Sequence, residues 1–202
     1  TGVQTCALPI SYLPGFFHAN IRRLPDVGCR VAYQSSTAIL TALEANELDL
    51  GVVCPPQRPP KTLNVTHRFA DAFTLIGSPE AASEFAKQPH SVEIKTAWLI
   101  RQNWLLLDES SNTGGRLRSW MHRQGLKVEP MMQLDSFDLI INLVALGIGV
   151  SFVPIRALAL YGQKRIERFS WRVRFERELV VMARRHRKMP PHLVQFIDNI
   201  LF

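Results

Sequence analysis

The sequence predicts an α/β protein with a largely parallel sheet. Over the first fifty residues, helix-type and strand-type patterns alternate in the order helix, strand, helix, strand. This order favours parallel strands joined by right-handed crossovers. Hydrophobic residues make up 47% of the 202 residues and charged residues 20%, a balance typical of a globular protein with a sizeable core. The longest apolar runs, about ten residues, are too short to span a bilayer.

The first elements follow from apolar spacing and from the residues that interrupt it. Residues 12–24 repeat apolar side chains at helical spacing, and Pro25 ends the pattern. Residues 27–33 alternate as a half-buried strand does. Ser35, Ser36 and Thr37 are N-cap candidates for the next helix. Residues 48–53 (LDLGVV) then form a short buried strand, which Cys54 and two prolines end.

The same criteria place the later elements. The sequence predicts strands over 73–77, 104–107, 127–134, 150–153 and 179–183, and helices over 79–87, 117–123, 136–146 and 191–201. The segment 108–113 between a strand and a helix is predicted to be a polar loop.

The charge of the chain is unevenly distributed. Of its net charge of +7, residues 156–188 carry eleven Lys or Arg against three Glu, and the remainder is close to neutral. A concentrated basic segment attracts nucleic acid or an acidic partner. We interpret the segment as a solvated edge of the fold, with binding of nucleic acid or of an acidic partner as the alternative.

The first ten residues, TGVQTCALPI, resemble the in-frame translation of a widely used sequencing adapter. We therefore expect residues 1–10 to be an artefact and the protein to begin near Ser11. Cys29 and Cys54 then remain, twenty-five positions apart, a spacing that predicts neither a disulfide framework nor a zinc site. This cysteine usage fits a reducing cytoplasm, and we expect no cofactor.

Three stretches, read in order, resemble the effector-binding domain of LysR-type transcriptional regulators. They are ALEANELDLGVV (42–53), NWLLLDESSNTGGRLRSWM (103–121) and SFDLIINLVALGIGVSFVPIRAL (136–158). Together with FHANIRRLPDV (17–27) they extend the resemblance over nearly all of residues 12–202. Each motif alone is weak, but their order and spacing are fairly specific.

The resemblance implies the type 2 periplasmic-binding-protein fold, in which two crossover strands join two Rossmann-like lobes. Lobe I would comprise residues 11–77 and 180–202, and lobe II residues 78–179. The implied function is ligand-gated control of transcription, with a small effector in the interlobe cleft and a homodimer or homotetramer as the assembly. The adapter-like peptide stands where the family has its first strand, so we expect that strand to be missing. Contact with DNA would need the family's winged helix-turn-helix, which the sequence lacks.

The candidate effector-binding residues lie at predicted strand ends and helix N-termini. Ligands of open α/β sheets bind there, because free N–H groups and the helix dipole favour a carboxylate or phosphate. Hydroxyl and amide side chains occur at three such points, and two aromatic residues are candidates for an apolar wall. The candidates are Ser36, Thr37, Ser110, Ser111, Asn112, Thr113, Ser136, Phe137 and Phe152. Ordinary N-capping is the alternative interpretation of the hydroxyls.

Other chemistries find little support in the residue pattern. Gly147 and Gly149 follow a helix instead of a strand, which argues against a dinucleotide loop. The neighbouring carboxylates Asp108 and Glu109 have no evident partner base, and the six histidines show no ligand spacing, so we predict no catalytic and no metal site. A transport solute-binding protein of the same fold remains the main alternative, and an enzyme on this fold a weaker one.

Overall fold

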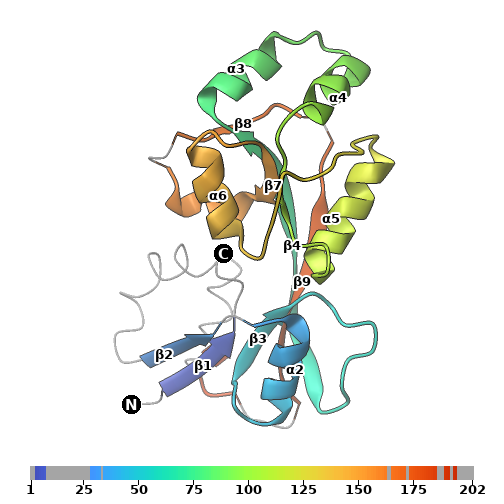
Figure 1. Ribbon diagram of the computed structural model, residues 1–202. Helices are drawn as coiled ribbons and strands as arrows, with labels where there is room; N and C mark the ends of the chain where they lie inside the picture. The colour runs from blue at the N-terminus through green and yellow to red at the C-terminus, as the bar shows by residue number, and fades with distance from the viewer. Residues whose placement is uncertain are drawn as a thin grey trace. The chain divides into compact units, whose positions relative to one another are not determined.

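The structure, a computed structural model, describes residues 3–7, 28–32, 34–162, 165–171, 173–185, 189–191 and 193–194. The chain divides into two compact units, one formed by Thr1–Asp71 and Arg177–Phe202 and the other by Ala72–Glu176. Both units combine strands and helices, which confirms the predicted α/β class (Figure 1). Among the described residues, no helix is long and apolar enough to cross a membrane.

The first unit is built on a mixed sheet. Strand β1 (Val3–Ala7) pairs in parallel with β2 (Gly28–Ala32) on one side and with β3 (Leu50–Val53) on the other. Helix α2 (Ser36–Glu44) connects β2 to β3 and so crosses over β1. On the other side of β3, strand β9 (Glu176–Arg184) runs antiparallel. The parallel pairing expected from the order of elements is therefore present.

The position of β1 corrects the expectation that the first strand is missing. Residues 3–7 belong to the adapter-like decapeptide, yet they occupy the place between β2 and β3, with Cys6 opposite both Val31 and Leu50. Any five-residue segment of suitable β propensity can supply the backbone hydrogen bonds of a ladder. Strands β2 and β3 thus both have β1 as a neighbour in the structure.

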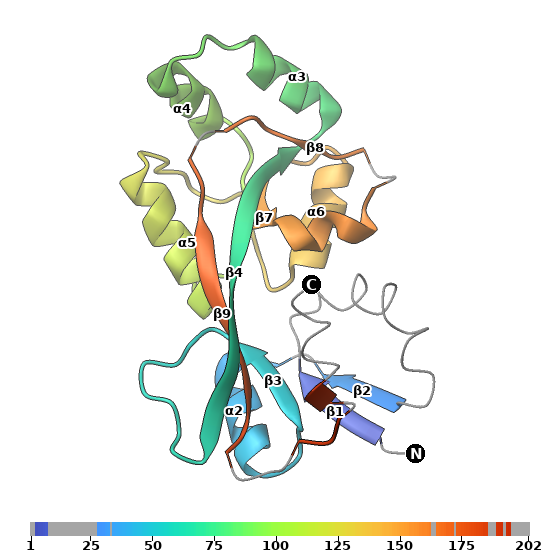
Figure 2. The same cartoon turned by 180° about the vertical axis from the view of Figure 1, so that it is seen from behind.

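Two strands, β4 (Leu63–Gly77) and β9, carry the chain from one unit to the other. They run alongside each other, as the Thr66 hydroxyl donates to the Val181 carbonyl at 3.2 Å and the Phe73 N–H donates to the Phe175 carbonyl at 2.9 Å (Figure 2). The lobe limits predicted at 77 and 180 fall within these same strands.

The sequence revealed only the last third of β4. Its first ten residues are mostly half-exposed or exposed, and the alternation of Leu63, Val65 and Phe69 with polar residues is a strand signal that was overlooked.

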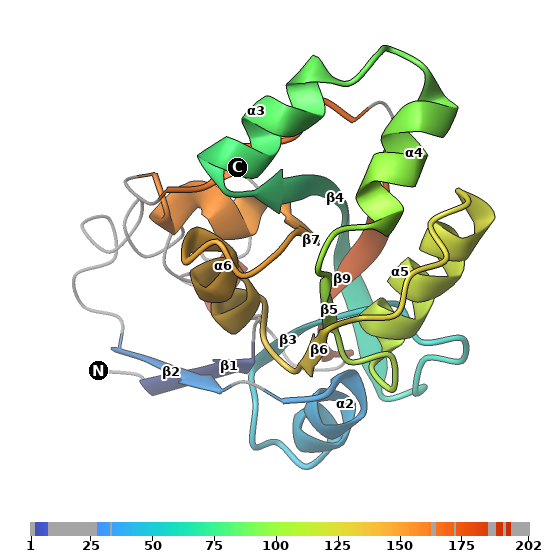
Figure 3. The same ribbon diagram turned by 45° about the horizontal axis from the view of Figure 1, so that its top comes forward.

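The second unit surrounds a second set of strands with four helices. Strand β5 pairs in parallel with β6, β4 pairs antiparallel with β7 and β8, and a bridge between Trp104 and Val150 links β5 to β7. Helices α5 and α6 flank β5 and β6 (Figure 3). The elements are α3 (Pro79–Lys87), α4 (Val92–Ile100), β5 (Leu105–Leu107), α5 (Asn112–Arg123), β6 (Met132–Leu134), α6 (Phe137–Ala145), β7 (Ser151–Pro154), the 3-10 helix η2 (Ile155–Leu160) and β8 (Glu167–Arg168).

Two buried clusters hold the second unit together. One is rich in aromatic rings: Phe152 stacks on Trp104 with ring centroids 5.6 Å apart and meets the edge of Trp120 at 5.1 Å. The other is aliphatic and joins α6 to β7 through Ile140, Ile141, Val144 and Val153. In the first unit, a separate cluster packs α2 on β3 and β9.

Five elements of the second unit differ from the prediction, and α4, η2 and β8 among them were not predicted at all. Helix α4 was missed because its apolar side chains point in several directions, with Val92, Ile94 and Ile100 exposed and Leu99 buried. Helix α5 begins at Asn112 instead of 117, since Ser111 provides its N-cap. Strand β6 covers only 132–134. The residues between the turn at Gly125 and Met132 are not part of its pairing with β5.

The remaining predicted elements agree to within a few residues or cannot be compared. The helix predicted over 79–87 coincides with α3, and Ser136 precedes α6 as its N-cap. The helix predicted over 12–24 and most of the helix predicted over 191–201 lie outside the described residues.

Candidate ligand-binding site

The structure brings two of the three predicted hydroxyl clusters to one edge of a sheet. Because β5 and β6 are parallel, their carboxyl ends face the same way, and the loops that lead into α5 and α6 start at that edge. The two loops contact each other directly, since the Asp108 N–H donates to the Leu134 carbonyl at 2.8 Å. The loop before α5 and Ser136 therefore lie close together in the second unit.

Ser111 is the N-cap of α5. Its hydroxyl oxygen accepts the N–H of Gly114 at 3.0 Å, and the hydroxyl itself donates to the Asp108 carbonyl at 2.6 Å. These two bonds use the only donor of the hydroxyl and one of its two acceptor positions, so the capping interpretation describes Ser111 well. On the first turn of α5, Asn112 is exposed and Thr113 is buried.

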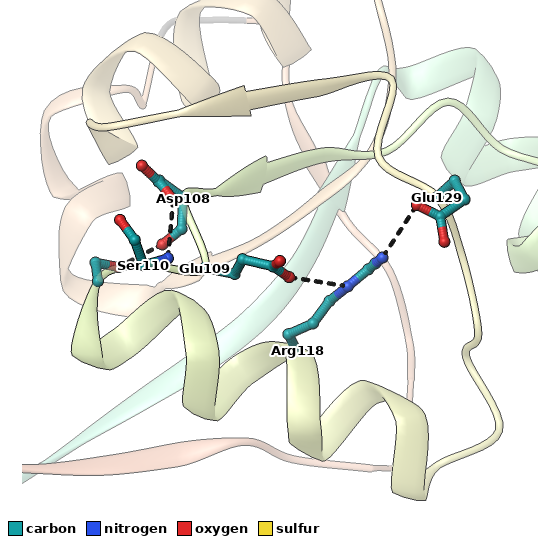
Figure 4. A network of polar contacts seen from close by, with 6 residues as sticks. Asp108, Glu109, Ser110, Arg118 and Glu129 are labelled. Carbon is teal, nitrogen blue, oxygen red and sulfur yellow. Dashed lines mark hydrogen bonds and ion pairs between the residues drawn. The ribbon is translucent and has the colours of Figure 1, made fainter.

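Asp108 organises the loop that presents Ser110. One carboxylate oxygen accepts the Ser110 N–H at 2.9 Å, which forms an Asx turn at the end of β5 (Figure 4). The Ser110 side chain itself is exposed. The turn-forming role of Asp108 was not predicted. An aspartate followed two residues later by serine at a strand end is a turn signal that could have indicated it.

Close approach of the loop to α5 depends on Gly114. A Cβ atom built at this position would lie 1.9 Å from the Asp108 carbonyl oxygen, a distance that no side chain tolerates. The glycine thus allows the Asp108–Ser111 loop to fold down on the first turn of the helix.

Ser136 differs from the other N-caps because its side chain makes no capping hydrogen bond. The caps Ser35, Ser78, Ser91 and Ser111 each accept a backbone N–H of the following helix. Ser136 is also half-exposed. Of the predicted hydroxyls in the second unit, this one fits ordinary capping least well.

Acidic residues divide the helix N-termini into two groups. Helices α3, α4 and α6 carry Glu80, Glu93 and Asp138 in their first turns, and these carboxylates already interact with the positive end of the helix dipole. The first turns of α2 and α5 contain no acidic residue. An anionic group is therefore less opposed at α2 and α5 than at the other three helices.

The third predicted cluster lies in the first unit, at the N-terminus of α2. Ser35 caps the helix by accepting the Ala38 N–H at 3.3 Å. Ser36 is half-exposed and Thr37 exposed, and the Thr37 carbonyl accepts the Thr41 hydroxyl at 3.2 Å. Both predicted side chains of this cluster are thus at least partly accessible to solvent.

The two aromatic candidates have different environments. Phe137 is half-buried at the start of α6 and meets Phe73 edge-on, with ring centroids 5.6 Å apart. Phe152 is only 2% exposed and is enclosed by Trp104 and Trp120. Its burial assigns Phe152 to the core of the second unit, the role that an apolar residue in a central strand most often has.

A groove beside α5 contains an arginine that the sequence analysis did not single out. Arg118 lies between two carboxylates, with Nε 3.8 Å from Glu109 and Nη2 3.6 Å from Glu129 (Figure 4). The groove is also lined by Asp108 and Ser110. Because acidic groups outnumber Arg118 here, this groove is poorly suited to an anion. Within the described part of the chain, no group of three or more potential metal ligands occurs.

Comparison with known proteins gives a family assignment over almost the whole chain. A protein-family model described as "LysR substrate binding domain" matches residues 5–201. A search of curated protein sequences gave no significant match.

Similar solved structures include regulatory domains and full-length regulators. The regulatory domain of Synechocystis PCC6803 CcmR, in complex with 2-PG, is 18% identical, with a TM-score of 0.72 over 100% of this chain and 96% of that one. The cofactor-binding domain of the Cbl transcriptional regulator has a TM-score of 0.77 at 18% identity, over 100% of this chain and 88% of that one. Full-length CbnR bound to its target DNA has a TM-score of 0.70 at 16% identity, over 98% of this chain and 69% of that one. These likenesses establish the type 2 periplasmic-binding-protein fold.

Proposed function

The chain belongs to the LysR substrate binding domain family, and from this premise we propose that it senses a small organic acid on behalf of a transcriptional regulator. Domains of this family are the regulatory ligand-binding regions of LysR-type regulators, which bind small effectors and DNA, form oligomers and are not enzymes. The match over residues 5–201 carries the proposal. A transport solute-binding protein, the main alternative, is not favoured by this assignment.

We further propose that the effector contacts the carboxyl edge of β5 and β6. Three features support this position: the Ser136 hydroxyl, which makes no capping bond, the exposed Asn112 side chain, and the first turn of α5, which contains no acidic residue. Ser110 lines the acidic groove beside α5 and is left out of the site. Backbone N–H groups at such a helix end favour a carboxylate or phosphate. Ser36 and Thr37 would contribute from the first unit, as an interlobe site of the family fold requires. Because Phe152 is enclosed in the core, it is left out of this site.

In the proposed mechanism, the effector changes the populations of two lobe arrangements. A ligand shifts such an equilibrium only by the difference between its affinities for the two states. The shift would alter how a homodimer or homotetramer presents DNA-binding domains outside this chain.

A ligand screen tests the proposed class of effector. Small organic acids, each paired with its neutral amide, are tested for their effect on the melting temperature of the 202-residue chain. We expect at least one acid to raise the melting temperature in a saturable way and its amide to have little effect. Equal stabilisation by acids and amides would contradict an anionic effector.

A pair of serine variants then tests the site with the acid that the screen selects. Ser136→Ala should weaken binding about tenfold, the effect of one lost hydrogen bond to a charged group, with little loss of stability because no capping bond is removed. Ser119→Ala, an exposed serine further along α5, should bind as the wild type does. Unchanged affinity of Ser136→Ala by isothermal titration would remove Ser136 from the site.

A further inference from the structure

The second unit contains a pocket that the proposed function does not use. It lies at the edge of β4 on the side where the chain returns toward β9, and it has a volume of about 280 Å³. Its walls include Phe73, Thr74, Ile155, Arg168, Trp171 and Arg174. None of the predicted effector-binding residues lines this pocket.

An irregularity in strand pairing creates the pocket. The Phe73 N–H donates to the Phe175 carbonyl at 2.9 Å, and the Phe169 N–H donates to the Leu75 carbonyl at 2.9 Å. Phe73 and Leu75 are thus two positions apart in β4, whereas their partners Phe175 and Phe169 are six positions apart in the returning chain. The extra residues leave the ladder, as in an enlarged β-bulge, a feature that is frequent near functional sites.

The pocket combines an apolar wall with two positive charges. Ile155, Val173 and the ring of Trp171 supply apolar surface, and Arg168 and Arg174 stand on the rim with exposed side chains. The Arg168 Nε also donates a long hydrogen bond of 3.5 Å to the Thr74 hydroxyl, which holds this guanidinium over β4. Among the described residues that line the pocket, none is acidic. In this respect the pocket differs from the groove beside α5, where carboxylates surround Arg118.

Trp171 contributes its ring to the pocket wall. The ring packs against Phe85, with centroids 6.1 Å apart, and its indole Nε1 is buried away from solvent. A molecule in the pocket therefore contacts the ring of Trp171 and not its N–H.

From these observations we propose that this pocket is a second binding site, selective for a small carboxylate with an aromatic or branched apolar body. Arg168 and Arg174 bind the carboxylate through charge-assisted hydrogen bonds, and Trp171 and Ile155 contact the apolar body. This pocket and the site proposed at the N-termini of α5 and α6 share no residue.

The test uses the 202-residue chain and 4-fluorophenylacetate as the probe, with the neutral 4-fluorophenylacetamide for comparison. Binding is followed by ¹⁹F NMR of the probe and by the indole ¹H–¹⁵N signals of the four tryptophans. The variant Trp171→Phe identifies the Trp171 signal by its loss. We expect the acid, but not the amide, to shift that signal saturably.

Charge variants then identify the groups that hold the carboxylate. Arg168→Gln combined with Arg174→Gln should weaken binding of the acid about tenfold or more, because each guanidinium supplies a charged hydrogen bond. Both side chains are exposed, so the fold should remain intact, as the other three indole signals report. Arg165→Gln is the matched control, since this exposed arginine of the same segment does not line the pocket and instead interacts with Glu80.

The outcomes separate this site from the one proposed above. Weaker binding in the double arginine variant, with unchanged binding in Arg165→Gln and Ser136→Ala, supports the second site. If Ser136→Ala weakens binding while the arginine variant does not, the probe binds at the other site and the inference is wrong. Equal shifts by acid and amide, or no shift of the Trp171 signal up to the solubility limit of the probe, also overturn it.

Discussion

At the scale of single residues, Gly114 has the strongest steric constraint near the candidate site. The loop that presents Ser110 and caps α5 rests on this glycine, and a Cβ atom would meet the Asp108 carbonyl oxygen at 1.9 Å. The obstructing atom belongs to the backbone, so it cannot rotate away as the end of a flexible side chain would.

We predict that Gly114→Ala destabilises the chain by about 3 kcal/mol, because either the loop or the first turn of α5 must move. Gly162→Ala serves as the control. No atom lies within 4 Å of a Cβ built at Gly162, so its free energy of unfolding should change by less than about 0.5 kcal/mol. Urea denaturation followed by circular dichroism measures both values, and similar stabilities would show that the loop adapts freely.

Tyr161 links the start of α6 to the end of η2. Its hydroxyl donates to an Asp138 carboxylate oxygen at 2.7 Å. Burial, followed by this hydrogen bond and by the charge of Asp138, raises the pKa of Tyr161. The folded state therefore favours the neutral phenol more than the unfolded state does.

A group whose pKa is higher in the folded than in the unfolded state stabilises the fold at pH values below its unfolded pKa. This contribution decreases as the pH rises above the unfolded pKa and toward the folded pKa. We predict that the wild type loses stability above about pH 10 more steeply than Tyr161→Phe does. Denaturation midpoints test this difference when they are measured over pH values from about 8 to 11, a range that brackets the ordinary tyrosine pKa. Parallel curves for the two proteins would show that the hydrogen bond to Asp138 does not couple to stability.

At the scale of elements, β4 and β9 are joined by an ion pair at the place where the chain passes between its units. Arg177 Nε donates to Asp71 Oδ2 at 2.8 Å, and the side chains are only 6% and 0% exposed. A second pair on the same strands, Arg68 with Glu178 at 3.2 Å, is exposed at both ends. The two pairs thus differ mainly in burial.

Removing one partner of the buried pair should have a large effect, because the other charge stays buried. We predict that Asp71→Ala lowers the free energy of unfolding by about 3–5 kcal/mol. Glu178→Gln, which breaks the exposed pair, should change it by less than about 1 kcal/mol. Chemical denaturation compares the two variants, and a small effect of Asp71→Ala would mean that water reaches Arg177.

At the scale of the whole molecule, each unit has its own buried clusters, although β4 and β9 belong to a sheet with strands of both units. The first unit depends on β1, whose backbone pairs with strands on both sides. The second unit contains both clusters that surround β5 and β7, and none of the described residues before Ala72 contributes to them.

A deletion of residues 1–10 tests this division. We predict that the amides of β2 and β3 lose protection from hydrogen exchange, because both strands lose their shared neighbour, whereas those of β5 and β7 remain protected. Removal of Thr1 and Gly2 alone, which precede β1, is the control. If β3 stays protected in the deletion variant, β1 is dispensable for the first unit, as expected of a foreign peptide.

The strongly patterned segments were predictable from the sequence, and the reason is local. Helix α3 shows apolar spacing and a serine cap before Pro79, and α6 combines an apolar stripe with the stop at Gly147. Buried strands such as β3 are continuous apolar runs bounded by breakers. Helix α4 was not predictable, because its apolar residues follow no single period, whereas the first part of β4 could have been found from the alternation of Leu63, Val65 and Phe69.

The sequence by itself determined the α/β class, the family resemblance and the serines at strand ends, since spacing, capping and turn chemistry act over a few neighbouring residues. Only the tertiary structure decided which of these serines meet, because the pairing of β5 with β6 joins segments about thirty residues apart. It also decided that Phe152 is buried, that the Ser136 hydroxyl makes no capping bond and that a pocket forms beside Thr74. Each of these depends on atoms from distant parts of the chain, whose contacts no local pattern encodes.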